Sequence, residues 1–155
     1  MDVTTSDFWI LIGVSVLCGG VIGLERQVRG KPAGIRTSML ICLGTALFIT
    51  LGRSELGPNS DTTRVLGQVV TGIGFLGAGV ILIRGEAVMG VTSAAVIWLM
   101  AAIGAMIGFE QYLEAIVISF LTVGILSGIR LLEARYAMLR RGAHALSKDN
   151  QESDH

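Results

Sequence analysis

The chain has 155 residues, of which 52% are hydrophobic and only 15% charged, and its formal net charge is zero. An ordinary soluble domain carries roughly 25% charged residues, and a small one exposes too much of its surface to hide so many apolar side chains. The composition therefore excludes an ordinary soluble domain. It indicates the lipid bilayer as the surroundings of the chain, and we expect no nucleic-acid partner.

Long uncharged runs alternate with short polar segments along the chain. A run of about 20 mostly apolar residues suffices to span a membrane. Residues 1–7, the predicted periplasmic N-terminus, lack the basic region of a cleavable signal peptide, so we interpret the first apolar run as a retained span. Five spans are predicted at residues 8–24, 35–52, 65–83, 91–109 and 112–132, followed by a cytoplasmic tail at 133–155. The predicted fold is an all-α membrane domain, a bundle of five transmembrane helices over residues 8–132.

The basic residues set the predicted orientation. Ten of the twelve Lys and Arg residues fall between the first two spans or at the start of the second, between the third and fourth, or from the end of the fifth onward. Only Arg53 and Arg64 fall in the remaining segments. Because short cytoplasmic loops carry an excess of Lys and Arg, we predict the N-terminus outside the cytoplasm and the C-terminus inside.

Glycines are concentrated in the spans. Pairs spaced four residues apart put a smooth strip on one helix face, which favours close helix packing; these pairs are Gly19 and Gly23, Gly104 and Gly108, and Gly124 and Gly128. The spacing fits packing within the chain and also a homo-oligomer.

A second glycine pattern, G-x-G-x-x-G with one further glycine, comprises Gly72, Gly74, Gly77 and Gly79. A dinucleotide site would need a strand before this motif and an acidic residue about 20 positions later. Here the motif lies in an apolar span, so we expect it to kink or thin the third helix. We predict no cofactor.

Polar residues gather at the predicted cytoplasmic ends of the first four spans. They are Glu25, Arg26, Lys31, Arg36, Thr37, Arg84, Thr92 and Ser93. We interpret them as a candidate polar vestibule, in which charge-assisted hydrogen bonds hold an ionised Glu25. The alternative is ordinary anchoring at the interface, with Thr92 or Ser93 as a helix cap.

A smaller outer polar group consists of Asp61, Arg64 and Gln68. One Asp gives weak support for a magnesium site, since Mg²⁺ takes one or two carboxylates besides its waters. We therefore assign no metal ligand.

No span has a central carboxylate, which argues against an ion-coupled carrier. The spans also lack the nucleophile–base arrangements of catalysis, and we predict no catalytic residue and no enzyme.

Several sequence blocks have the order and spacing of a known family. They are Gly-Leu-Glu-Arg-Gln at 23–27, Gly-Lys-Pro-Ala-Gly-Ile-Arg-Thr at 30–37, the glycine-rich run at 72–82, Gly-Val-Thr-Ser-Ala-Ala-Val-Ile-Trp at 90–98 and Ala-Ala-Ile-Gly at 101–104. Over roughly residues 8–132 the chain resembles the MgtC/SapB family of bacterial inner-membrane proteins. The family's Asp-Pro-x-Arg motif is matched by residues 61–64, with Thr62 in place of proline.

The resemblance implies a multi-pass protein of the bacterial inner membrane, linked to growth at low magnesium. It also implies a regulatory role, with the F-type ATP synthase as a membrane partner of some members. Many members carry a soluble C-terminal domain, for which residues 133–155 are too few. We expect a non-enzymatic module that regulates partner membrane proteins in magnesium homeostasis or stress adaptation. The alternative is a transporter or channel for Mg²⁺ or another small solute.

Overall fold

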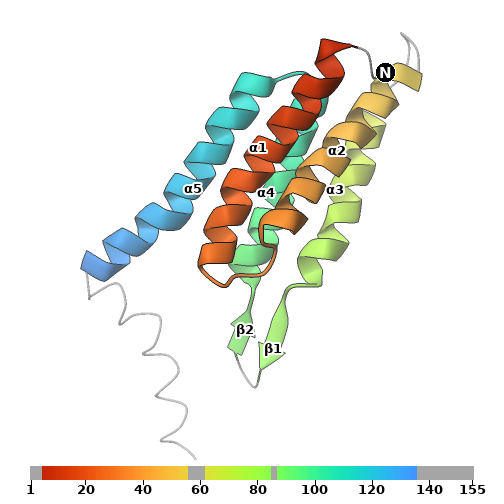
Figure 1. Ribbon diagram of the computed structural model, residues 1–155. Coiled ribbons are helices and arrows are strands. Elements are labelled where there is room, and N and C mark those ends of the chain that lie inside the picture. Colours follow the sequence, from red (N-terminus) through yellow and green to blue (C-terminus); the bar gives the residue numbers. More distant parts are fainter. Residues whose placement is uncertain (1–4, 56–61, 85–86, 136–155) are drawn as a thin grey trace, which may run out of the picture. The chain divides into compact units, whose positions relative to one another are not determined.

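Five helices and one short hairpin make up the described chain. The computed structural model describes residues 5–55, 62–84 and 87–135. The elements are α1 (Ser6–Val28), α2 (Ile35–Glu55), α3 (Thr62–Ala78), β1 (Leu82–Arg84), β2 (Ala87–Met89), α4 (Val91–Gly108) and α5 (Tyr112–Arg135) (Figure 1). Residues 1–4 of the predicted periplasmic start and 136–155 of the predicted tail lie outside this description.

Four of these helices are long and apolar enough to cross a membrane, namely α1, α2, α4 and α5. Helix α3 has 17 residues, a rise of about 25 Å along its axis. A multi-pass helical membrane protein is thus confirmed, with the hairpin as the exception to an all-α fold. The count of five spans and their orientation stay predictions.

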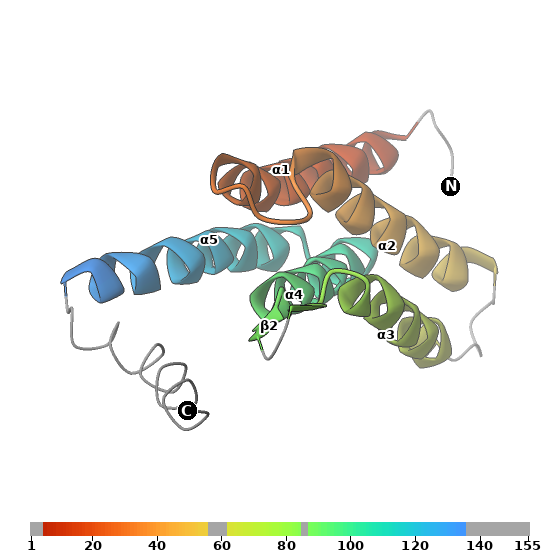
Figure 2. The same cartoon turned by 90° about the horizontal axis from the view of Figure 1, so that it is seen from below.

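The chain divides into two units, residues 1–120 and 121–155. The first holds α1 to α4, the hairpin and the start of α5, and the described part of the second is the rest of α5. In the first unit α2 and α4 pack against each other, and both contact α1 and α3. Seen from below, α4 lies between α1 and α3 (Figure 2). The core of this unit therefore forms around α4, ten of whose 18 residues are buried.

Two glycine pairs bring neighbouring helices into backbone contact with α2. A Cβ added at Gly19 of α1 would stand 2.6 Å from the carbonyl oxygen of Ser38, and one at Gly23 would stand 2.6 Å from Cα of Ile35. On α4, a Cβ at Gly104 would stand 2.5 Å from the carbonyl oxygen of Cys42. Side chains cannot be accommodated at such distances, so these glycines allow α1 and α4 to approach α2 closely.

The second pair continues along α4. A Cβ at Gly108 would stand 2.6 Å from Cβ of Ile49 and 2.8 Å from the carbonyl oxygen of Ala46. Helix α2 is thus held by a glycine pair of α1 near its first turns and by a glycine pair of α4 further along.

The third helix ends earlier than the apolar run predicts. The sequence suggests a span to residue 83, whereas α3 ends at Ala78 and its last turn tightens, with Ile81 N–H donating to the Ala78 carbonyl at 3.0 Å. The run that follows is rich in β-branched and other apolar residues, which fit an extended chain. It enters an antiparallel hairpin in which Ile83 pairs with Val88. The glycine-rich run therefore terminates the helix, where we had expected a kink or thinning within it.

Gly90 joins the hairpin to α4. Its φ of +92° lies in the left-handed region, and an added Cβ would collide with the carbonyl oxygen of Val80. Glycine meets both requirements because it has no Cβ. Gly90 is also the N-cap residue of α4, without a side-chain cap hydrogen bond, so neither Thr92 nor Ser93 is the N-cap residue.

At the end of the bundle away from Gly90, Arg53 of α2 contacts the end of α4. Its Nη1 donates to the Gly108 carbonyl at 2.9 Å and to Glu110 Oε1 at 3.0 Å, and the guanidinium lies 5.9 Å from the centre of the Phe109 ring. Glu110, at φ 66°, and Gln111 donate backbone hydrogen bonds to the last turn of α4, which is the Schellman pattern of helix termination.

Candidate functional site

A buried arginine links α1 to α4 at the end of the bundle where the loop 29–34 lies. Arg26 is only 3% exposed, and its Nη2 donates a hydrogen bond to the hydroxyl oxygen of Ser93. Ser93 is itself buried, in the first turn of α4. A buried guanidinium is costly unless its donors are satisfied, so this contact fixes how the two helices meet.

Glu25, the residue before Arg26, is paired within α1. Arg29 Nε lies 2.6 Å from Glu25 Oε1, at the i,i+4 spacing that places two side chains on one helix face. The Glu25 side chain is 7% exposed. Its second oxygen, Oε2, is buried and has no hydrogen-bond partner among the described residues. Glu25 thus retains the capacity to accept a hydrogen bond from a water molecule or a bound ligand.

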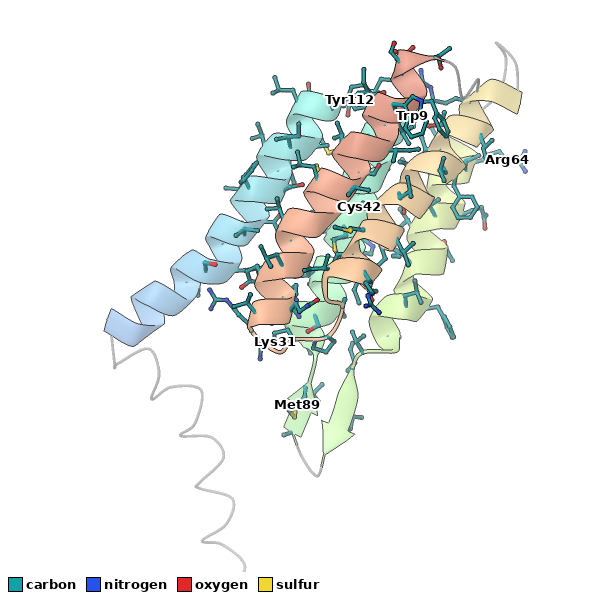
Figure 3. The ribbon with its side chains drawn as sticks, in the orientation of Figure 1. Trp9, Lys31, Cys42, Arg64, Met89 and Tyr112 are labelled. Carbon is teal, nitrogen blue, oxygen red and sulfur yellow. The ribbon has the colours of Figure 1, made fainter. Side chains whose placement is uncertain are left out.

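The loop 29–34 is held by hydrogen bonds from both flanking helices. Gln27 Oε1 accepts the backbone N–H of Ile35 at 3.3 Å, and Ser38 Oγ donates to the Ala33 carbonyl at 3.1 Å. Gly30 and Ala33 adopt positive φ values of 60° and 61°. These contacts give the loop a defined path beside Glu25 and Arg26. Figure 3 shows Lys31 at this end of the bundle, with Arg64, Trp9 and Tyr112 towards the other.

The structure separates the predicted polar vestibule into two sets. Arg26 and Ser93 meet in the interior, and Glu25, the neighbour of Arg26 in the chain, pairs with Arg29. The remaining side chains described, those of Lys31, Arg36, Thr37 and Thr92, are exposed. The side chain of Arg84 lies outside the described part. The candidate site is therefore the set Glu25, Arg26, Arg29 and Ser93, which we call the inner cluster.

Arg29 is the member of the inner cluster that the sequence reasoning left out. Its spacing of four residues from Glu25 is the signal that points to it, since such pairs interact on a helix surface. The Arg26–Ser93 contact joins residues 67 positions apart, and no local spacing predicts their meeting.

The outer polar group is described in part. Arg64 and Gln68 are both exposed on α3, four residues apart and so on one helix face. Asp61 lies outside the described residues. Whether the three residues act together stays a prediction.

The other predicted packing glycines differ in their surroundings. A Cβ at Gly77 or Gly79 would meet atoms at 3.4–3.7 Å, an ordinary contact distance. At Gly72, Gly74, Gly124 and Gly128 an added Cβ would meet no described atom within 4 Å. Among the predicted packing glycines, close helix approach thus belongs to the first two pairs, on α1 and α4.

Comparison with known proteins finds relatives over most of the chain. The model of the MgtC family matches residues 12–135. The putative magnesium transporter YhiD of Escherichia coli K12 is 41% identical over 138 residues, covering 84% of this chain and 64% of YhiD. Protein SrpB of Synechococcus elongatus is 38% identical over 162 residues, covering 91% of this chain and 88% of SrpB.

Protein MgtC of Brucella suis is 40% identical over 129 residues, which are 82% of this chain and 54% of that protein. The chain thus spans between half and two thirds of YhiD and of this MgtC. No solved structure matches the chain. The extent of the family match and the identity to these relatives establish the relationship: the chain belongs to the MgtC family.

Proposed function

We propose that the chain is a non-enzymatic protein of the bacterial inner membrane that regulates partner membrane proteins in magnesium homeostasis or stress adaptation. The observation that supports this role is the close packing along α2. Glycines of α1 and α4 lie against its backbone, so that added Cβ atoms would stand 2.5–2.8 Å from backbone atoms of Ser38, Cys42 and Ala46. A path for a solute needs open space and a polar lining. Helices packed this closely suit a rigid body whose outer faces contact partner proteins.

The connection with magnesium comes from the relatives. YhiD is named a putative magnesium transporter, and the other matched proteins include several named MgtC. Resemblance to the family further suggests the F-type ATP synthase as a partner. The activity and partners of the longer relatives are part of the proposal for this chain.

Quantitative purification tests the regulatory role. The tagged full chain is solubilised in mild detergent from bacteria grown at low magnesium, and the proteins retained are measured by mass spectrometry. We expect enrichment of the membrane sector of the F-type ATP synthase over the amount retained by an unrelated tagged membrane protein expressed at the same level. Equal retention by both proteins would contradict this partner. The absence of any reproducibly enriched membrane protein would contradict the regulatory role itself.

The inner cluster favours one alternative, a transporter or channel for Mg²⁺ or another small solute. Its basis is the buried Glu25 with an oxygen that lacks a described hydrogen-bond partner. Proteoliposomes holding a magnesium indicator test it. For a regulator we expect no influx above that of empty vesicles. Influx that is lost in Glu25→Gln but kept in Glu110→Gln, a matched change of an exposed glutamate, would establish transport and contradict our proposal.

A further inference from the structure

An open groove runs between α2 and α3. Its volume is about 360 Å³, and its walls are formed by Thr45 and Phe48 of α2 and by one face of α3 from Val65 to Leu76. Most of this lining is apolar, and Phe48 and Leu76 are 63% and 50% exposed. The eleven steps along the helix from Val65 to Leu76 rise about 16 Å, roughly half of the ~30 Å hydrocarbon core of a bilayer. The groove therefore has the depth of one leaflet.

Polarity changes in a fixed order along α3. Gln68, Gly72 and Leu76 line the groove at intervals of four residues, and Arg64 lies one turn before Gln68, next to the residues that line the groove. From the end of the bundle inward, α3 thus presents a cation, an amide, an open space and an apolar side chain. The space is real, because a Cβ at Gly72 would meet no described atom within 4 Å.

The charged end of this series lies at the level of an interface. Arg64 is found towards the same end of the bundle as Trp9 and Tyr112 (Figure 3), and Trp and Tyr are enriched where a membrane meets water. Trp9 is 61% exposed and is thus available to headgroups. Arg64 is exposed as well, and its guanidinium is a planar fork that suits phosphate oxygens.

We propose that this groove binds one anionic glycerophospholipid. The phosphodiester accepts charge-assisted hydrogen bonds from Arg64, an ester carbonyl below it accepts one from the amide of Gln68, and an acyl chain lies over Gly72 between Phe48 and Leu76. The order of chemical groups in the lipid, which is anion, ester and hydrocarbon, follows the order of residues along α3. This inference is independent of the regulatory role proposed above.

Native mass spectrometry of the full chain in mild detergent tests the site, with phosphatidylglycerol as the anionic probe and phosphatidylcholine as the zwitterionic one. We expect the wild type to retain one phosphatidylglycerol in preference to phosphatidylcholine. Arg64→Ala should weaken that binding by about tenfold, the loss expected for a hydrogen bond to a charged group. Lys31→Ala removes an exposed cation at the other end of the bundle and should leave binding unchanged.

A second pair of variants tests the groove itself. Gly72→Leu fills it, whereas Gly74→Leu adds the same side chain to α3 at a position that is also open but does not line it. We expect loss of phosphatidylglycerol in Gly72→Leu alone. Equal retention of both lipids by the wild type, or equal effects of the two leucines, would overturn the proposal. So would a dimer that Gly72→Leu dissociates, since the occupant would then be a second copy of the chain.

Discussion

At the scale of single residues, Arg26 is a charge buried inside the helix bundle. The residue is 3% exposed, and its contact with Ser93 crosses from α1 to α4. Removing the partner of a buried charge is more damaging than removing an exposed contact, because the charge stays buried without full compensation. Ser93 therefore matters through Arg26 and not as a cap.

Ser93→Ala should lower the free energy of unfolding by about 1–3 kcal/mol, the cost of leaving a buried polar group without its acceptor. Thermal unfolding in detergent measures this with a thiol-reactive fluorophore, since Cys18 and Cys42 are buried in the folded chain and react on unfolding. Thr92→Ala alters the exposed neighbour and should change stability by less than about 0.5 kcal/mol. Equal effects of the two alanines would show that the Arg26 contact contributes nothing.

The Glu25–Arg29 pair leads to a second prediction. Arg29→Ala removes the described ion-pair partner of a carboxylate whose side chain is 7% exposed, so it should destabilise the chain by about 1–3 kcal/mol. Adding Glu25→Gln to that variant replaces the uncompensated charge with a neutral amide and should restore part of the loss. The same thermal assay measures both variants. A double variant less stable than Arg29→Ala would contradict the pairing as the cause.

Some of the inner cluster was predictable from the sequence and some was not. The positions of Glu25 and Arg26, directly after an apolar run and before a basic loop, predict a polar site near the membrane surface. Sequence alone does not show that Arg26 turns inward while Arg36 stays exposed, because both are arginines beside an apolar run. That difference arises from the tertiary contact with Ser93.

At the scale of helices, packing depends on where glycines face a neighbour. Gly104→Ala would place its Cβ 2.5 Å from the Cys42 carbonyl oxygen, so the backbone of α2 or α4 must shift, a change that typically costs about 1–3 kcal/mol. Gly44→Ala on α2 meets no atom within 4 Å and should be neutral or stabilising by up to about 1 kcal/mol, because alanine favours helices. Midpoints of thermal unfolding compare the two. Similar midpoints would contradict glycine-mediated contact between α2 and α4.

The lengths of the apolar runs predicted the helices better than their ends. The expected spans at 35–52 and 91–109 differ from α2 and α4 by no more than three residues at either end. The expected span at 65–83 failed at its end, since hydropathy does not distinguish an apolar helix from an apolar hairpin. The informative signals were Gly79, at the first turn after α3, and Gly90, whose positive φ starts α4.

At the scale of the whole molecule, the number of crossings decides which segments share a side of the membrane. Lys31 and Arg64 lie towards opposite ends of the bundle (Figure 3). If all five helices cross, the segment after α5 returns to the side of Lys31. If α3, which is short at 17 residues, does not cross, that segment emerges on the other side. The side of the membrane on which the tail emerges therefore shows whether α3 crosses it.

Single cysteines at three positions test this topology, in a chain whose Cys18 and Cys42 are replaced by alanine. We expect Thr63→Cys to react with a membrane-impermeant maleimide in intact spheroplasts, whereas Lys31→Cys and Ser147→Cys should react only after the membrane is opened. This pattern follows from the cytoplasmic excess of Lys and Arg and from five crossings. Labelling of Ser147→Cys in intact spheroplasts, with Lys31→Cys still protected, would show that α3 does not cross. Labelling of Lys31→Cys with protection of Thr63→Cys would reverse the orientation and place the inner cluster on the periplasmic side.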